Sequence, residues 1–479
     1  MAGSTGSGVE GWRRIVTGGV PARAVALALV LLGACSSPPA PEPASKPSTA
    51  PVAIDRQPPT APVEVAKAPA PAAEPTKPAP AFAPRFDPPR PVPPKVEPTV
   101  RVRVGTRLRE PQSFRCPSGE FTVLVGSERW TAQAPLRVTR TATGWSVTAK
   151  GSARSFAAGL MELRPVGKAS LDWDGASWPG VATLVPLPDG VDVVMQVGVE
   201  EYLPGVLAKE LYPQWDEDAF RAQAVAARSW VLVEESRWEG RRHYDVTSGE
   251  SSQAWAGHTR NARAREAVAA TCGMVLVFEG GVVPAFYSSS CGGRGANAMG
   301  SVTQNPNHDI GPVRSGDQPA RTGCCEAASF KASSHYRWSA TVAPATVQQA
   351  IRAYGQRNGF PTWAGIDVPI AIEASQTASN GRPVEYRLRF KERNPVMIPA
   401  SKLREAINGG IAGEGGSRTL KSDDFTVAPT PKGFVFTGRG FGHGVGMCQH
   451  GAQATAKAGK EWRAILERYY PGARCERAW

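Results

Sequence analysis

The distribution of proline limits which part of this chain can fold. Of its 44 prolines, 21 lie between Pro38 and Pro98. A segment so rich in proline and alanine lacks the apolar side chains that a core needs. We therefore expect residues 36–100 to form an extended linker with a reach of at most roughly 190 Å. The foldable part begins near Val100 and is long enough for more than one domain.

The first 35 residues have the features of an export signal. Arginines precede an apolar run at residues 24–32, which is too short to cross a bilayer comfortably. Residues 32–35, Leu-Gly-Ala-Cys, resemble the lipobox of bacterial lipoproteins. This resemblance implies that Cys35 is lipidated and holds the chain in the cell envelope, at the outer membrane facing the periplasm if the source has two membranes. The alternative is an ordinary signal peptide in which Cys35 is a free thiol.

The rest of the chain divides by pattern into two folded regions, which together predict an α+β fold. Residues 101–190 carry short alternating apolar runs separated by glycines and polar residues, a pattern typical of a β-rich region. The runs are 100–104, 121–125, 136–139 and 145–148. Residues 191–479 mix helical and strand patterns and form the second domain, with a β-rich insertion near residues 335–430.

Two helices are predicted at the start of the second domain. Apolar residues follow helical spacing over residues 199–211, although we expect Pro204 and Gly205 to break or kink this segment. Asp216 is a plausible N-cap of the next helix, because acidic residues follow it in the first turn. The apolar stripe of that helix comprises Phe220, Ala224, Ala227 and Val231. It predicts a buried helix packed beside the first one.

Strand and loop signals follow these helices. Residues 274–278 and 282–287 are typical of a β-hairpin around a Glu-Gly-Gly turn. A helix is expected near residues 343–354. A glycine-rich loop at residues 438–446 leads into two short helices that end at Tyr470.

Four motifs occur in order along the second domain. Residues 199–210 read VEEYLPGVLAKE, 220–228 read FRAQAVAAR, 284–293 read PAFYSSSCGG and 438–452 read GRGFGHGVGMCQHGA. Together they resemble the SpoIID family, the sporulation stage II protein D and amidase-enhancer group. This family includes lytic transglycosylases that cleave peptidoglycan glycan strands, and members that stimulate a cell-wall amidase.

The resemblance implies roles for individual residues. Glu210, at the end of the first motif, matches the catalytic glutamate of the family. The residues implied to bind substrate are Gln223, Arg228, Tyr287, Ser290, His443 and Gln449. Two of them have structural alternatives: Arg228 could form a salt bridge between the two helices, and His443 could stabilise a tight turn.

One carboxylate is enough for the chemistry that the resemblance implies. A lytic transglycosylase needs an acid that protonates the glycosidic oxygen, while the 6-hydroxyl of muramic acid attacks C1 of the same sugar. Glu210 stands between Leu207 and Leu211, and apolar burial there would raise its pKa and keep it protonated. The alternative is a solvated glutamate at a helix end.

The resulting hypothesis is a peptidoglycan lytic transglycosylase that needs no cofactor and leaves 1,6-anhydro ends. Its alternative is a glycan-binding protein that activates a cell-wall amidase without cutting. The presence of Glu210 favours the enzyme. The chain has a formal net charge of +13, but basic and aromatic residues do not interleave on one element. We therefore expect peptidoglycan strands rather than nucleic acid as its partner, and a lipid anchor as its contact with the membrane.

Seven cysteines remain beyond the lipobox. In an oxidising envelope, disulfides are the default for well-placed pairs. We expect one between Cys291 and either Cys324 or Cys325, and a second between Cys448 and Cys475.

No metal site is predicted. Some members of the family hold zinc with cysteine and histidine shortly after the second helix, but residues 244–255 contain neither residue type. A site made by His443, Cys448 and His450 is the alternative. A further alternative makes Cys291 a nucleophile activated by His443.

Overall fold

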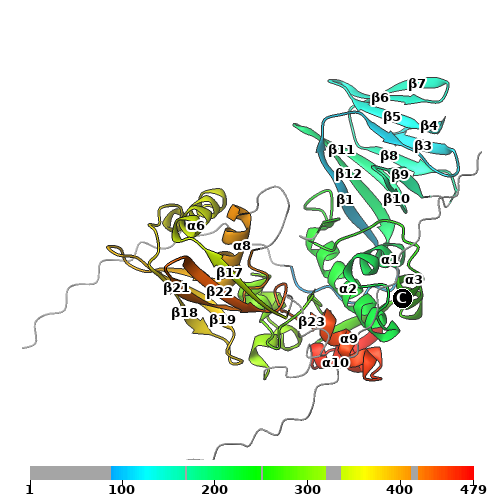
Figure 1. Cartoon of the computed structure of the whole chain (residues 1–479). Coiled ribbons are helices and arrows are strands. Elements are labelled where there is room, and N and C mark those ends of the chain that lie inside the picture. The colour runs from blue at the N-terminus through cyan, green and yellow to red at the C-terminus, as the bar shows by residue number, and fades with distance from the viewer. Residues whose placement is uncertain (1–87, 168–169, 250–251, 320–335, 412–418) are drawn as a thin grey trace, which may run out of the picture. The chain divides into compact units, whose positions relative to one another are not determined.

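The computed structural model describes most of the chain from Pro88 onward (Figure 1). The described residues are 88–167, 170–249, 252–319, 336–411 and 419–479. The predicted export signal with Cys35, most of the linker, Cys324 and Cys325 lie outside them. Within the described ranges, no helix is both long enough and apolar enough to cross a membrane.

The N-terminal part of the described chain is built from strands, which confirms the predicted β-rich region. The bounds are β1 Thr99–Leu108, β2 Gln112–Phe114, β3 Glu120–Val125, β4 Glu128–Gln133, β5 Leu136–Arg140, β6 Gly144–Ala149, β7 Ser152–Ala157, β8 Met161–Pro165, β9 Leu171–Trp173, β10 Ala176–Trp178, β11 Val181–Leu187, β12 Gly190–Gly198 and β13 Val246–Thr247. One sheet has the order β13–β1–β12–β11–β8–β3–β4, another has the order β2–β5–β6–β7, and β9 pairs with β10. Burial alternates along β5, where Leu136 and Val138 belong to the core.

Helix α1 (Val199–Glu210) follows β12 directly and packs beside α2 (Glu217–Trp238). The helix continues through Pro204, so the predicted interruption is wrong. Proline removes only one backbone hydrogen bond here, and the buried side chains around it favour an unbroken helix. Gly205 serves close packing instead, because a Cβ atom there would lie 2.2 Å from the carbonyl oxygen of Gly257.

Helix α2 begins where the sequence predicts. The Asp216 carboxylate accepts a hydrogen bond from the backbone N–H of Asp218 at 3.1 Å, which is an N-cap. The predicted apolar stripe from Phe220 to Val231 is buried. Helix α3 (Ala262–Ala270) packs against both α1 and α2.

The turn and first strand of the hairpin predicted after these helices are confirmed, but its second strand ends at Val282 and does not extend to residue 287. Strands β14 (Met274–Phe278) and β15 (Gly281–Val282) pair antiparallel around Glu279 and Gly280, which both have positive φ as a tight two-residue turn requires. Strand β24 (Arg474–Arg477) pairs with the other edge of β14. Short helical turns occupy the next loop: α4 Ala298–Ser301, η1 Pro306–His308, η2 Gly311–Val313 and η3 Ser315–Asp317.

A two-residue parallel pairing joins distant parts of the chain. Strand β16 (Tyr287–Ser288) pairs with β23 (Met447–Cys448), which brings the third and fourth motifs side by side. The helices α9 (Gln449–Lys457) and α10 (Trp462–Tyr469) follow, as predicted, and both pack on α2. This arrangement sets the fourth motif against the first two.

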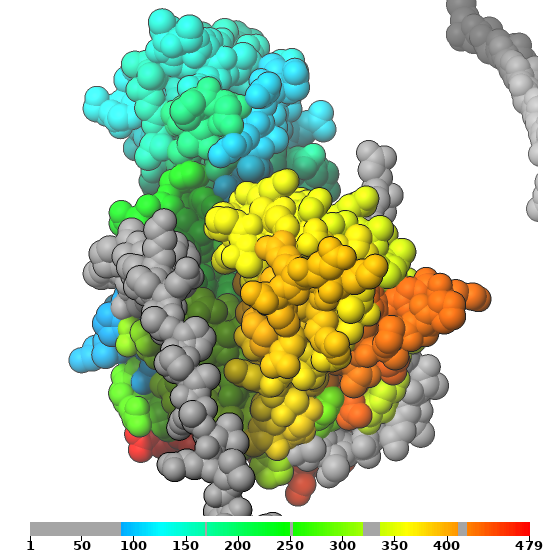
Figure 2. Space-filling view, turned by 90° about the vertical axis from the view of Figure 1, so that its left-hand side faces the viewer, coloured from blue at the N-terminus to red at the C-terminus, as the bar shows by residue number. Residues whose placement is uncertain are grey.

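Residues 337–439 form a module with its own hydrophobic core. Its elements are β17 Arg337–Val342, α6 Pro344–Asn358, α7 Pro361–Ala364, β18 Ala371–Thr377, β19 Pro383–Arg389, β20 Val396–Pro399, α8 Ala400–Ile411, β21 Phe425–Thr430 and β22 Gly433–Arg439. The strands form two sheets, β17–β22–β21 and β18–β19–β20. Helix α6 confirms the predicted helix near residues 343–354. In the space-filling view the yellow and orange part of this module forms one continuous surface (Figure 2).

Candidate active site

Glu210 is the last residue of α1 and is half-buried. The side-chain amide of Gln449 donates a hydrogen bond to Glu210 Oε2 at 2.9 Å, across 239 residues of sequence. Gln449 is itself buried as the first residue of α9, whose N-terminus is capped by Cys448 Sγ accepting from Gly451 N–H at 3.3 Å. The first and fourth motifs therefore meet at the Glu210 carboxylate.

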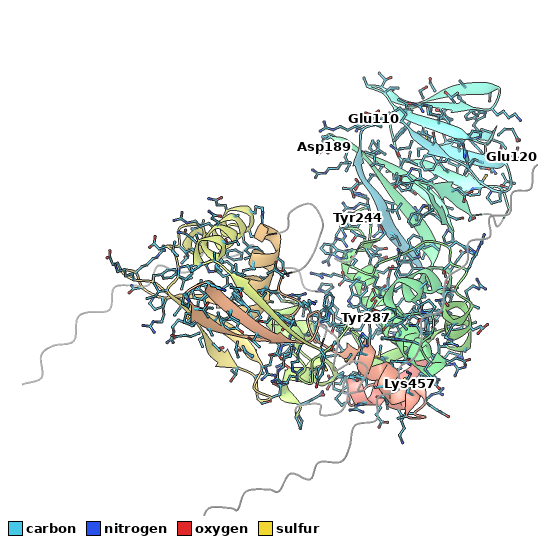
Figure 3. The ribbon with its side chains drawn as sticks, in the orientation of Figure 1. Glu110, Glu120, Asp189, Tyr244, Tyr287 and Lys457 are labelled. Atoms are coloured by element: carbon cyan, nitrogen blue, oxygen red, sulfur yellow. The ribbon has the colours of Figure 1, made fainter. Side chains whose placement is uncertain are left out.

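Tyr202, which is buried, and Tyr287, which is partly buried, lie in the electrostatic field of Glu210. Burial raises the pKa of both Tyr202 and Tyr287 well above the usual value, and the negative charge of Glu210 raises it further. Tyr202 donates from its hydroxyl to Gln253 Oε1 at 3.1 Å, and Gln253 donates to the carbonyl of Ala227 at 3.2 Å. Both phenols remain protonated at neutral pH. Tyr287 lies on β16 and is labelled in Figure 3.

A cavity of about 650 Å³ extends from this region. Its lining includes Tyr287, which lies in the field of Glu210, and Gln253, which bonds Tyr202, but neither Glu210 nor Gln449 lines it. Another part of the lining comes from the start of α8, with Lys402 and Arg404. This volume falls within the range of ordinary ligand sites, roughly 300–1,000 Å³.

Two histidines that line the cavity are uncharged at neutral pH. Burial lowers the pKa of both His308 and His443 to about 4. His443 Nδ1 accepts a hydrogen bond from the Val445 backbone N–H at 3.0 Å, so Nε2 carries the proton in the neutral ring. His443 thus supports the turn of the glycine-rich loop, which was its structural alternative, and it also faces the cavity.

Two of the implied substrate-binding residues are buried inside the helix pair. Arg228 is fully buried and pairs with Glu200, with nitrogen–oxygen distances of 2.9 and 2.6 Å, and it donates to the Met274 carbonyl at 3.1 Å. The assignment of Arg228 to substrate is therefore wrong, and the alternative of a salt bridge between α1 and α2 is correct. Gln223 is also fully buried, and its amide has no hydrogen-bond partner among the described residues. It does not line the cavity.

Ser290 likewise supports the scaffold rather than the cavity. It is buried, and its backbone N–H and carbonyl pair with Phe441 at 3.0 and 2.8 Å. Its hydroxyl accepts from the Gly292 N–H at 3.3 Å. These contacts hold the glycine-rich loop against the third motif, and Ser290 is absent from the cavity lining.

The structure does not contain the expected disulfide between Cys448 and Cys475. Cys475 has a free thiol on β24, opposite Leu276, and burial raises its pKa to about 11. Cys448 lies on β23, where its sulfur accepts from the backbone N–H of Cys291 at 3.4 Å. The two cysteines are on strands of different sheets, which explains the failed prediction. The expected partners of Cys291 lie outside the described residues.

The alternative metal site does not form. His450 packs edge-on against Trp215, with ring centroids 4.9 Å apart. In the part of the chain that the structure describes, no group of three or more histidine, cysteine or acidic side chains could hold a metal ion.

Sequence reasoning missed two residues beside Glu210 and the contribution of α8. Tyr202 lies within the first motif, and its helical position among buried apolar residues is the signal that could have found it. Gln253 lies in residues 244–255, the stretch in which some family members have zinc ligands. It is a polar residue that the fold buries, and it accepts a hydrogen bond from Tyr202. No local signal connects Lys402 with this cavity.

The protein thus has an α+β fold in which the four motifs come together, and Gln449 holds the Glu210 carboxylate by a hydrogen bond. Residues 188–278 match the SpoIID family, described as Stage II sporulation protein, and residues 325–446 match a domain of unknown function, DUF8618. Residues 188–278 are thus similar to the SpoIID family.

The relatives of this chain are distant in sequence. Stage II sporulation protein D of Bacillus subtilis is 25% identical over 323 residues, covering 62% of this chain and 82% of the relative. An amidase enhancer of the same organism is 27% identical over 294 residues, covering 56% of this chain and 39% of the relative. An uncharacterized protein of Brachyspira hyodysenteriae is 26% identical over 300 residues, covering 62% and 72%. The chain therefore spans about two fifths of the amidase enhancer.

Proposed function

We propose that this protein is a peptidoglycan lytic transglycosylase in which Glu210 is the acid and base. The observation that supports this most is the setting of the Glu210 carboxylate. Gln449 donates a hydrogen bond to one of its oxygens, and two protonated tyrosines lie nearby. One of these tyrosines, Tyr287, lines a cavity that is large enough for sugar residues. The similarity to the SpoIID family supports the same proposal.

The proposed reaction needs one carboxyl group. Protonated Glu210 gives its proton to the glycosidic oxygen as the bond between muramic acid C1 and that oxygen breaks. The 6-hydroxyl oxygen of the same muramic acid attacks C1 and closes the 1,6-anhydro ring. Its proton passes to the Glu210 carboxylate, which returns the site to its starting state. The hydroxyls of Tyr202 and Tyr287 remain neutral donors throughout.

We propose that the protein acts in the cell envelope, anchored through a lipid on Cys35. The lipobox resemblance and the proline-rich linker support this location. A long linker would let the folded part reach glycan strands away from the membrane.

The test is digestion of purified glycan strands with the whole protein. We expect 1,6-anhydro products from the wild type, measured by mass spectrometry. Glu210→Gln should lower the rate by about 10²–10⁴-fold and leave strand binding largely intact, because proton transfer contributes only in the transition state. Glu201→Gln, an exposed change on the same helix, is the matched control and should keep wild-type activity. A wild-type rate for Glu210→Gln would overturn the assignment.

The second candidate function is activation of a cell-wall amidase without cutting. The similarity to an amidase enhancer favours it. If the wild type releases no products from strands yet increases the rate of an added cell-wall amidase, this function replaces the first. Glu210 would then be a strand-binding residue.

A further inference from the structure

Tyr212 lies two residues beyond Glu210 and exposes its ring to solvent. Its exposure is 49%, and among the large apolar side chains that the described residues leave exposed it is the one aromatic. The other exposed side chains in that group are valine, leucine, isoleucine or methionine. An exposed aromatic ring forgoes the free energy of burial unless something else covers it.

The Tyr212 ring is held in place by its neighbours. Its centroid lies 5.4 Å from that of Trp215 and 6.3 Å from that of His450. Trp215 is buried, and its backbone N–H donates to the Tyr212 carbonyl at 3.0 Å. The three rings form a fixed cluster, which we call the aromatic shelf. Because the shelf is already ordered, a ligand that stacks on Tyr212 would lose little side-chain entropy on binding.

The shelf is tied to the same elements that hold the Glu210 carboxylate. His450 directly follows Gln449, the residue that donates to Glu210. The His450 backbone N–H donates to the Ser289 carbonyl at 3.1 Å, which fixes the start of α9. The aromatic shelf and the Glu210 carboxylate are therefore held by neighbouring residues of the same two segments, the end of α1 and the start of α9.

We propose that Tyr212 forms a sugar subsite next to Glu210, where the apolar face of a pyranose ring stacks on the tyrosine. In β-1,4-linked N-acetylated glycans the ring substituents are equatorial, so axial C–H groups cover both faces of each sugar. Such a face matches an exposed aromatic ring in shape and polarity. The inference that the bound sugar belongs to peptidoglycan rests on the proposed function. The inference that a sugar ring stacks on Tyr212 does not depend on it.

The test measures equilibrium binding in the Glu210→Gln background, so that no cutting occurs. The probes are glycan strands freed of peptides and an uncharged β-1,4-linked N-acetylglucosamine tetramer. Tyr212→Ala should weaken binding of both probes by about ten-fold, while Tyr212→Phe should stay within about two-fold because it keeps the ring. Ile370→Ala, which alters an equally exposed apolar side chain outside the shelf, is the control and should bind as the parent does. Circular dichroism of each variant verifies folding.

Kinetics on the active protein separate this inference from the proposed function. If the wild type cuts strands, Tyr212→Ala should raise KM by about ten-fold with kcat nearly unchanged. If the wild type cuts nothing but Tyr212→Ala still loses binding, the sugar subsite stands and the proposed reaction fails. Binding by Tyr212→Ala equal to that of the parent, for both probes, would overturn the subsite.

Discussion

A side chain distant in sequence, that of Gln449, contributes to the position of the Glu210 carboxylate. Gln449 is a neutral donor, so it orients a carboxyl group without holding it permanently charged as a lysine or arginine would. Such a partner suits the acid and base role that we propose for Glu210. Gln453, one turn further along α9, serves a different purpose, because it accepts from the Asp216 backbone N–H at 2.8 Å.

These two glutamines give the first prediction. Gln449→Ala should lower kcat by up to about ten-fold with little change in KM, because the net contribution of one hydrogen bond between neutral groups is roughly 0.5–1.5 kcal/mol. Gln453→Ala on the same helix should leave kcat unchanged. The measurement is initial-rate kinetics on glycan strands over a range of pH, where Gln449→Ala should also alter the pH profile. Equal kcat values for the two variants would contradict a positioning role for Gln449.

At single residues, the motifs predict which side chains come together, whereas the role of a residue depends on partners that are distant in sequence. Glu210 and Gln449 both belong to motifs, and the structure brings them together. Arg228 belongs to a motif as well, but its partner Glu200 lies on another helix. The sequence left both roles of Arg228 open, because only the packing of the helices decides between ion pair and substrate contact.

At the scale of elements, local signals were sufficient for the helix starts and tight turns. The Asp216 cap and the Glu279–Gly280 turn depend on neighbouring residues only, and both were predicted. The β16–β23 pairing was not predicted. Each of these strands has two residues, too few for a periodic pattern, and they lie far apart in sequence. The break expected at Pro204 did not occur, because tertiary packing outweighed the local effect of the proline.

The α1–α2 pair gives the second prediction, through its buried ion pair. Glu200→Ala should lower the free energy of unfolding by roughly 3–5 kcal/mol, because it leaves the Arg228 guanidinium buried without its counter-charge. Glu201→Ala changes the next residue, which is exposed, and should shift stability by less than about 0.5 kcal/mol. The measurement is urea unfolding followed by tryptophan fluorescence.

The double variant Glu200→Leu with Arg228→Met is the further control. It removes both charges, so it should recover much of the stability lost in Glu200→Ala. Similar unfolding midpoints for Glu200→Ala and Glu201→Ala would show that the ion pair contributes little.

At the scale of the whole folded part, the 337–439 module contacts the loops around the site. The ion pair of Arg294 with Asp424 joins it to the loop that follows the third motif, and within the module Asp423 pairs with Arg382. Arg382 also donates to the His443 carbonyl at 2.8 Å. These contacts link residues that are far apart in sequence, so a pattern along the chain could not reveal them. The start of α8 lines the cavity, and its Ser401 hydroxyl donates to the Gly300 carbonyl at 3.0 Å.

The last prediction concerns Lys402 on that wall. Lys402 lines the cavity and is partly exposed, with Glu405 Oε2 at 3.0 Å. Glu405 keeps a hydrogen bond from the Tyr354 hydroxyl at 2.7 Å, so the loss of Lys402 leaves no buried charge unpaired. If the module contributes to binding, Lys402→Gln should raise KM for glycan strands by about three- to five-fold with kcat unchanged, since an exposed charged contact contributes up to about 1 kcal/mol.

Lys391→Gln is the matched control for Lys402→Gln. Lys391 is an exposed lysine of the same module that does not line the cavity, so this change should leave KM as it is in the wild type. Both variants should unfold at the wild-type urea concentration, because each alters an accessible side chain. The effect of Lys402→Gln should also shrink as salt rises from 50 to 300 mM, roughly as charge screening shortens from about 14 to 6 Å. A KM that moves equally in the two variants would mean that the module acts through net charge alone, and that α8 has no specific part in holding the strand.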